Sequence, residues 1–393
     1  MTIVDQALAL NPFSFYRQMQ KESPVIFDPD YITHWGEKGV WHVFSYKEVK
    51  HVLSHHEIFS SQAMPVSEEN PISRNLVNSD PPRHTQLRKI ISKSFTPRVI
   101  SDLEPWIRNL AYELLEPAFE TGEMDFMYQF ATPLPIKVIL KLLGVNEDIT
   151  DKVLEWAKAT SANPAAVEGG IEAFIRAQQE QVELFTKLIQ ERQKQPQDDL
   201  ISLLVSAEID DNRLEMEDLL SFCMLLLVAG NETTTNLIGS SLLTFTEHPE
   251  IQEHLANNPE DIPKAVSEVL RYRSPSQSLF RRATQDVELA GQKIKKGDVI
   301  AVWFGAANHD PAAFPNPEVF DIHRDNHDHL AFGHGIHYCL GAPLAKLEAK
   351  VAFEVIFQNI EQIRVKPGAT IERHPSVLMY RLESLPVVFK TKQ

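Results

Sequence analysis

The sequence has few cysteines, no long apolar run and too few cations to balance its acids. Cys223 and Cys339 are the 2 cysteines of 393 residues, so a disulfide framework is excluded and a cytoplasmic protein with reduced thiols is expected. The longest apolar runs, such as residues 224–230 (MLLLVAG), are far too short to span a bilayer. The net charge of −16 argues against nucleic acid as a partner. The first residues lack the charged and apolar regions of a signal peptide.

The organisation of the chain predicts one mainly α domain over residues 1–393 with small peripheral β-sheets. It has no repeat, low-complexity segment or Gly/Ser linker. Apolar spacing predicts mostly helix over 81–285, with long helices at 171–195 and 216–248. Residues 1–80 and 286–393 are expected to contribute most of the strands. In the second range, 287–304 predicts a hairpin turning near Lys296–Gly297, and 370–390 predicts further strand.

Residues 332–341, FGHGIHYCLG, place Cys339 in a glycine-rich loop directly before an expected helix at 343–357. Glycines permit unusual backbone angles and remove bulk around the sulfur. Free N–H groups at a helix start stabilise a thiolate. This pattern indicates a rigid anionic sulfur, open on one side, that could bind a soft metal centre. For a lone cysteine, a small buried hydrophobe is the commoner interpretation.

Residues 229–234, AGNETT, interrupt the most apolar of the expected helices. A glycine costs about 1 kcal/mol inside a helix, and threonines are mediocre helix formers. Such local breaches tend to mark function, although an exposed polar patch on an amphipathic helix would also explain them. A threonine hydroxyl there could bond a carbonyl one turn back.

Two spaced pairs of polar residues follow helical periods. Glu268 and Arg271 are three apart, and His84 and Arg88 are four apart, so the members of each pair share a helix face. Alone, each pair is a very weak signal, and exposed surface charge worth little to stability is its default interpretation.

In chain order, the His84–Arg88 pair, the threonine helix, the Glu268–Arg271 pair and the cysteine loop together resemble the cytochrome P450 family. The resemblance implies the cytochrome P450 fold and haem b with Cys339 as its axial thiolate and metal ligand. Thr233 would be the alcohol that hydrogen-bonds the O2 co-substrate, and Glu232 the acid beside it, which together form the catalytic proton relay. The other expected haem-binding residues are His84, Arg88, Arg281, His337, Ala229, Phe332 and Gly341.

Within that haem-binding set, the resemblance assigns His84, Arg88, Arg281 and His337 to the haem propionates. Arg282 follows Arg281 directly, so this assignment is open by one residue. Glu268, Arg271 and Arg324 would form a buried network that holds the cysteine loop.

The implied activity is that of a monooxygenase, which inserts one atom of O2 into a C–H bond of a hydrophobic small molecule. The sequence lacks the G-x-G-x-x-G nucleotide-binding pattern, so electrons should come from a separate ferredoxin or flavodoxin with its NAD(P)H reductase, acting on a monomer. Cations that could dock an acidic donor are Arg83, Lys89, Lys93, Arg98 and Lys346.

The substrate is expected to resemble a steroid, a terpenoid or a fatty acid, as in soluble members from Bacillus-type organisms. The resemblance places a polar loop at 61–72 over the pocket. The pocket residues that it suggests are Leu225, Val228, Leu279, Val377 and Leu378. Two rival functions are a peroxide-driven haem-thiolate peroxygenase, which would replace the acid–threonine pair, and a non-catalytic haem carrier or gas sensor.

Overall fold

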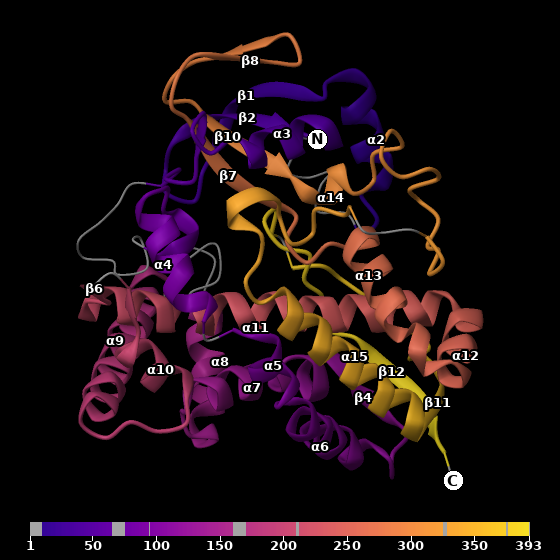
Figure 1. Ribbon diagram of the computed structural model, residues 1–393. Helices are drawn as coiled ribbons and strands as arrows, with labels where there is room; N and C mark the ends of the chain where they lie inside the picture. The colour runs from indigo at the N-terminus through magenta and orange to yellow at the C-terminus, as the bar shows by residue number, and fades with distance from the viewer. Residues whose placement is uncertain are drawn as a thin grey trace.

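The fold is a thick helical layer capped at one end by a β-sheet, as the computed structural model shows (Figure 1). The structure describes residues 10–64, 75–93, 95–159, 170–209, 212–324, 328–374 and 376–392. Helix α11 runs through the middle of the molecule, with α6, α7, α15 and the strands β4, β11 and β12 on one side of it and the strands β1, β2, β7 and β10 on the other (Figure 1). The expectation of a mainly α fold with small sheets is confirmed.

The α-helices follow the apolar periodicity of the sequence, and several of them begin at prolines. Proline suits the first turn of a helix, because its missing N–H would have no partner there. Pro97, Pro133 and Pro249 each begin a helix. The α-helices of the described residues are α2 Phe13–Glu22, α3 Tyr46–Ser54, α4 Arg83–Ser92, α5 Pro97–Ser101, α6 Glu104–Leu115, α7 Pro133–Leu143, α8 Thr150–Ala159, α9 Gly170–Lys194, α10 Leu200–Ser206, α11 Met216–Glu247, α12 Pro249–Asn257, α13 Ile262–Tyr272, α14 Phe304–Ala307 and α15 Ala342–Asn359.

The main sheet has five strands in the order β1-β2-β10-β7-β3, of which β10 pairs in parallel with β2 and antiparallel with β7. A second sheet has the order β11-β12-β4, and β5-β6 and β8-β9 are two-stranded. The strand bounds are β1 Val25–Ile32, β2 Lys38–Val43, β3 Phe59–Ser60, β4 Glu123–Asp125, β5 Glu208–Ile209, β6 Asn212–Arg213, β7 Ser278–Ala283, β8 Val287–Leu289, β9 Gln292–Ile294, β10 Val299–Trp303, β11 Ile360–Val365 and β12 Pro386–Thr391.

Two expected strand features differ in the structure. The hairpin of β8 and β9 turns at Ala290 and Gly291, both with positive φ, rather than at Lys296–Gly297. The latter pair forms a second turn that leads into β10, because Gly297 also has a positive φ of 94°. In 370–390, the described residues form a strand only over β12, and before it lie isolated bridges such as Ser276–Met379.

Glycines in α11 have a packing reason that local propensity does not reveal. A Cβ added at Gly230 would lie 2.6 Å from Ile139 Cδ1 of α7, and one at Gly239 would lie 2.4 Å from Met127 Sδ. Both distances are too short for a real contact, so these glycines let neighbouring segments approach the α11 backbone. The glycine in AGNETT thus has a packing role in addition to any role of its neighbours, because a larger residue would have to displace the Ile139 side chain.

A membrane-spanning helix is not found in the described part of the chain, because none of its helices is both long and apolar enough.

Glu348 is a buried acid in the middle of α15, only 1% exposed, and its Oε2 has no hydrogen-bond partner among the described residues. Desolvation by burial raises the pKa of Glu348 well above its ordinary value, so the neutral acid is the stable buried form. At pH values between the pKa of Glu348 in the unfolded chain and its higher pKa in the folded protein, the folded protein keeps a proton that the unfolded chain has lost. Stability should therefore fall as pH rises through that window.

Glu348→Gln should remove this pH dependence. The amide cannot ionise, and each unit of pKa difference between the folded and unfolded states corresponds to about 1.4 kcal/mol. Urea unfolding from pH 5 to pH 8 should show the variant gaining stability relative to the parent as pH rises. Parallel pH profiles for the two proteins would contradict this account.

Candidate active site

The cysteine loop is held by its own backbone. The Cys339 N–H donates to the Phe332 carbonyl at 2.9 Å, and Gly333 and Gly335 have positive φ values of 73° and 71°. A Cβ at Gly335 would lie 2.8 Å from the Leu53 carbonyl oxygen. Because only glycine fits this position, the loop can press against the end of α3 and keep the cysteine fixed.

The Cys339 sulfur lies at the start of α15, where the backbone N–H groups of Gly341 and Ala342 bond it. These N–H groups and the Arg88 charge favour the thiolate, but desolvation is the larger effect and raises the pKa of the thiol. The expected stabilisation of an anionic sulfur is thus present but outweighed by burial. A bound metal cation would supply the remaining stabilisation, because a coordinating thiol is deprotonated.

The middle of α11 presents a short open stretch within an otherwise buried helix. Val228 is 37% exposed, and the neighbouring Ala229 is also exposed, whereas residues 219–224 and 234–245 are buried. The Thr233 hydroxyl donates to the Ala229 carbonyl at 2.7 Å. Such bonding of a threonine to the preceding turn was expected from the sequence.

Cationic and imidazole side chains gather around the cysteine loop. The rings of His84 and His337 lie 4.2 Å apart, and His337 Nε2 lies 2.8 Å from the Ser61 hydroxyl. Desolvation, followed by the charges of Arg281, His84 and Arg88, lowers the pKa of His337 to about 3. The cluster therefore consists of neutral imidazoles and charged guanidinium groups, a donor-rich surface suited to anions.

The neighbouring arginines of β7 have different surroundings. Arg282 donates to both carboxylate oxygens of Glu37, at 2.9 and 2.6 Å. Arg281 is buried, its charge acts on His337, and burial lowers its pKa to about 10. Of the two arginines left open by the sequence, Arg281 is therefore the one that faces the cluster.

Glu268, Arg271 and Arg324 are brought together behind the loop. Arg271 donates to the two oxygens of Glu268 at 2.9 and 2.8 Å, and both side chains are fully buried. Arg324 Nε donates to Glu268 at 3.2 Å. Backbone groups complete the network: Arg271 donates to the Asn308 and Pro317 carbonyls. The pair is thus a bidentate interior ion pair rather than exposed surface charge.

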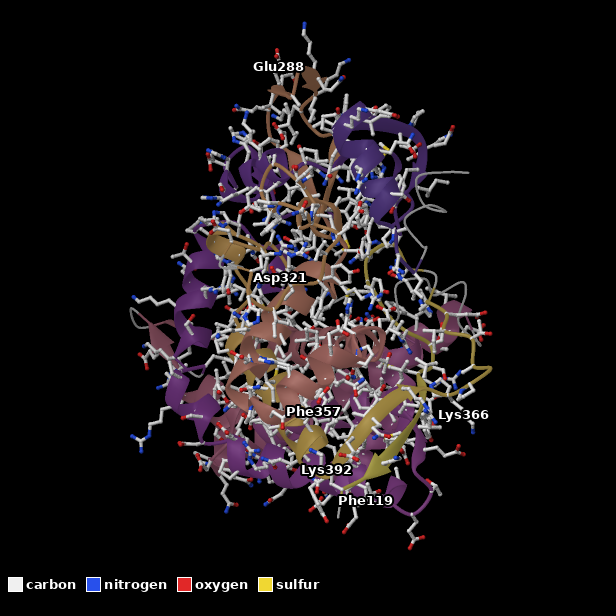
Figure 2. The ribbon with its side chains drawn as sticks, turned by 90° about the vertical axis from the view of Figure 1, so that its right-hand side faces the viewer. Phe119, Glu288, Asp321, Phe357, Lys366 and Lys392 are labelled. Carbon is white, nitrogen blue, oxygen red and sulfur yellow. The ribbon has the colours of Figure 1, made fainter. Side chains whose placement is uncertain are left out.

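This network lies where the sheet end of the molecule meets the helical end. The backbone N–H of Asp321 donates to Glu268 at 3.1 Å. Figure 2 shows Asp321 midway between Glu288, at the sheet end, and Phe119 and Lys392, at the helical end. The network therefore ties α13 to the irregular segment that precedes the cysteine loop.

The expected substrate-pocket residues occupy three segments. Leu225 and Val228 lie on α11, Leu279 lies on β7 with 36% of its surface exposed, and Val377 and Leu378 lie beside β7. The Ser278 hydroxyl donates to the Val377 carbonyl, and the Gln277 N–H donates to that of Leu378. Of the expected loop 61–72, residues 65–72 lie outside the described residues.

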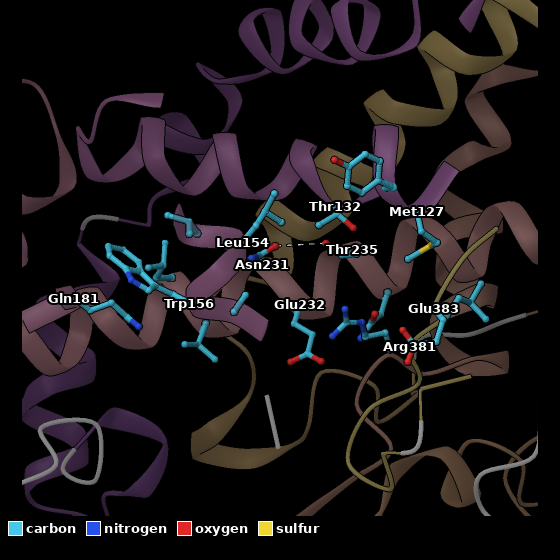
Figure 3. A pocket seen from close by; sticks show the side chains of 17 residues that line it. Met127, Thr132, Leu154, Trp156, Gln181, Asn231, Glu232, Thr235, Arg381 and Glu383 are labelled. Atoms are coloured by element: carbon cyan, nitrogen blue, oxygen red, sulfur yellow. Dashed lines mark hydrogen bonds between the residues drawn. The ribbon is translucent and has the colours of Figure 1, made fainter. Parts of the chain in front are cut away.

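A cavity of about 290 Å³ adjoins α11 and includes Glu232 and Val228 (Figure 3). Glu232, Arg381 and Glu383 point to the same side of the helix in this view. Burial raises the pKa of Glu232, and the charges of Arg381 and His374 oppose the rise. Arg381, Glu383 and Gln181 were not expected here, because they come from segments far from α11 in the sequence and match no motif.

Comparison with known proteins decides the family. A sequence model described as "Cytochrome P450" matches residues 2–148 and 170–381. The chain belongs to the cytochrome P450 family.

Relatives within the cytochrome P450 family span almost the whole chain. Cytochrome P450 109 of Bacillus spizizenii is 36% identical over 390 residues, covering 96% of this chain and 92% of its own. The structure of substrate-free CYP109E1 from Bacillus megaterium superposes with a TM-score of 0.91 at 35% identity, covering 98% of this chain and all of the other. CYP109E1 in complex with testosterone has a TM-score of 0.86 at 35% identity and covers 96% and 99%. The cytochrome P450 fold and the monooxygenase class are thereby confirmed.

The residues present fit a haem group, the cofactor of this family. Haem needs a thiolate on one side and cationic or hydrogen-bonding partners for two propionates. Cys339 and the cluster of His84, Arg88, Arg281 and His337 offer these donors. His84 Nε2 is buried and has no hydrogen-bond partner among the described residues, which leaves a donor or acceptor for such a ligand.

Proposed function

We propose that this cytochrome P450 is a haem-thiolate monooxygenase with Cys339 as the axial ligand of haem b. The observation that carries the proposal is the position of the Cys339 sulfur. Backbone N–H groups of Gly341 and Ala342 fix it, and the expected propionate partners His84 and Arg88 of α4, Arg281 of β7 and His337 of the loop lie around it. The Phe332 backbone carbonyl accepts a hydrogen bond from the Cys339 N–H. Phe332 and Gly341 are proposed to contact the haem on the side of Cys339.

When bound, haem supplies the activation of O2, and the side chains of the protein supply position and protons. Thr233 Oγ1, which now donates to the Ala229 carbonyl at 2.7 Å, can turn to hydrogen-bond O2 and pass on a proton. Glu232 is the adjacent acid, and its raised pKa lets it hold a proton closer to neutral pH. Ala229 has only a methyl group and leaves room beside Thr233.

The substrate is proposed to be a hydrophobic small molecule of the steroid, terpenoid or fatty-acid type. The related CYP109E1 structure with testosterone supports the steroid class, and the apolar residues Leu225, Val228 and Leu279 support hydrophobic contact. Haem-loaded protein with a reductase system, 18O2 and a substrate that shifts the haem to high spin should yield a product with one labelled oxygen atom. Product formation with hydrogen peroxide but not with O2 and reductase would overturn the proposal in favour of a peroxygenase.

Thr233→Ala should bind substrate nearly normally but divert electrons from NAD(P)H into hydrogen peroxide instead of product, because the hydroxyl that relays protons is lost. Peroxide formed per NAD(P)H consumed should rise several-fold and product should fall. Thr246→Ala is the matched control, since its hydroxyl also donates to a preceding α11 carbonyl, that of Leu243, but lies outside the site. An equal yield of product per NAD(P)H consumed in the parent and the Thr233 variant would count against the proton relay.

The electron donor is proposed to be a separate ferredoxin or flavodoxin that serves a monomeric, cytoplasmic enzyme. One of the cations expected to dock the electron donor is excluded by the structure. Arg83 pairs with Asp218 of α11, so its charge is already compensated. Lys346 lies over the Phe332 ring, 5.4 Å from its centre, next to the cysteine loop. Arg98 has only a long, exposed contact with Asp102 at 4.0 Å, so the proposed docking patch is Lys89, Lys93, Arg98 and Lys346.

Lys89→Glu with Lys93→Glu should weaken donor affinity roughly tenfold at low salt, because a steering patch changes sign. Donor reduction of the parent should also slow as salt rises, with screening over about 10 Å at 0.1 M. The substrate-induced spin shift should remain unchanged. Reduction of the double variant at the parent rate would place the docking site elsewhere.

A further inference from the structure

Ser61 is a buried serine whose hydroxyl bonds the cysteine loop. The residue follows β3 and is 2% exposed, and its Oγ lies 2.8 Å from His337 Nε2. We expected Ser61 at the start of a loop over the substrate pocket, but its hydroxyl contacts one of the expected haem-propionate partners. A buried hydroxyl on such a partner indicates a role at the haem site.

Asp80 fixes the backbone on which this hydroxyl lies. Its Oδ1 accepts the Ser61 N–H at 3.0 Å, and its Oδ2 accepts the Ser60 hydroxyl. The Asp80 carbonyl also accepts the His84 N–H at 2.9 Å, in the first turn of α4. Ser60 pairs with Arg282 of β7. Ser61 is therefore held at a point where α4, β7 and the cysteine loop meet, the three elements that carry the expected propionate partners.

The contact at Nε2 leaves the other ring nitrogen of His337 for a ligand. Nδ1 has no hydrogen-bond partner in the described part of the chain, and the His84 ring lies 4.2 Å from the His337 ring. An anion beside Nδ1 favours the forms of the ring in which Nδ1 carries a proton. The Ser61 hydroxyl can serve each of these forms, because it donates to Nε2 of a neutral ring and accepts from the Nε2–H of a charged one.

We propose that Ser61 is a positioning residue for the haem, whose hydroxyl holds the His337 ring at Nε2 and so leaves Nδ1–H to hydrogen-bond a haem propionate. Asp80 acts through Ser61, since it fixes the backbone N–H of that residue. A serine suits this place because it adds no charge, whereas an acid at position 61 would repel the propionates. The inference rests on the proposed haem-thiolate function and adds two residues to its haem site.

Ser61→Ala should lose haem about fivefold faster than the parent, because a ring without its second hydrogen bond can turn away from the propionate. Ferric enzyme mixed with excess apomyoglobin gives the rate constant from the absorbance of the transferred haem. The propionate bending band in the resonance Raman spectrum should shift as well, since it responds to hydrogen bonds at the propionates. The dissociation constant of a substrate that shifts the haem to high spin should match that of the parent.

Ser79→Ala is the matched control. Ser79 is also buried and adjoins Asp80, but its hydroxyl donates to the Asn75 carbonyl at 2.8 Å. This variant should keep the parent rate of haem loss and the parent propionate band. If Ser61→Ala does not fold, Ser61→Cys decides, because its thiol is a weak hydrogen-bond donor and acceptor and should also give faster haem loss than the parent.

A double-mutant cycle with His337→Phe tests whether Ser61 acts through the imidazole. Phenylalanine keeps a ring next to His84 but removes both nitrogens, so this variant should itself lose haem faster than the parent. In its background, Ser61→Ala should change the rate by less than about twofold, because the atom that Ser61 holds is already gone. A serine that only stabilised the fold would have the same effect in both backgrounds.

Three results would overturn the inference. The first is parent-like haem loss in Ser61→Ala, with or without a change in substrate binding. The second is an equal rise in the rate of haem loss from Ser61→Ala in the parent and in the His337→Phe background. The third is an equal rise in Ser79→Ala, which would make the loss a general effect of removing a buried hydroxyl. In each case a parent enzyme with the red-shifted ferrous–CO band would leave the proposed function intact, whereas a parent without that band would refute the function itself.

Discussion

Cys339→Ser should abolish the red-shifted Soret band of the ferrous–CO complex while most of the fold survives. The hydroxyl of serine is far less acidic than a thiol and does not provide a thiolate ligand to iron. The Cys339 side chain takes little part in the core: the residue keeps exposed surface although neighbouring atoms desolvate its sulfur, and its loop is held by backbone groups. Reduced difference spectra with carbon monoxide measure the band, and circular dichroism measures the fold.

The second cysteine provides the control. Cys223 is completely buried in α11, and burial raises the pKa of its thiol to about 12, so it stays protonated and inert. Cys223→Ala should therefore keep the red-shifted band. An unchanged band in Cys339→Ser, or its loss in Cys223→Ala with the fold intact, would show that the axial ligand is misassigned.

Arg271→Ala and Glu268→Ala should each yield little or no haem-loaded protein. Both side chains are 0% exposed and share two hydrogen bonds of 2.8 and 2.9 Å. Removing one partner leaves the other charge buried and uncompensated, at a cost of about 3–5 kcal/mol. A typical domain has only about 5–15 kcal/mol of stability, so this loss is a large fraction. Haem content per folded protein and the urea midpoint measure the effect.

An exposed pair gives the comparison. Arg98 and Asp102 lie 4.0 Å apart on the surface with side chains 91% and 72% exposed, and such pairs contribute about 0–1 kcal/mol. Arg98→Ala should load haem like the parent. Normal haem loading in Arg271→Ala would show that the buried network is dispensable for the cysteine loop.

The sequence alone determined the features that depend on local order along the chain. The glycine-flanked Cys339 before a helix, the long helix around Thr233 and the pairs at helical spacing can each be identified from neighbouring residues, because backbone geometry fixes which side chains share a face. These motifs, taken in their order along the chain, were enough to predict the fold and the family. The expected helices at 171–195 and 216–248 correspond to α9 and α11 within about one residue at each end.

Tertiary structure alone decided how residues far apart in sequence are paired. The sequence offered no reason to choose between the adjacent Arg281 and Arg282 as the propionate partner. In the structure Arg282 pairs with Glu37, which is far away in the sequence, and this leaves Arg281. Likewise, only packing shows that Asp218 compensates Arg83 and that burial outweighs helix N–H groups at the Cys339 thiol. The cavity beside α11 is lined both by Gln181 of α9 and by Arg381 and Glu383 near the C-terminus, a combination without a local signal. Burial and charge compensation depend on the three-dimensional surroundings of a side chain, and sequence spacing does not specify these.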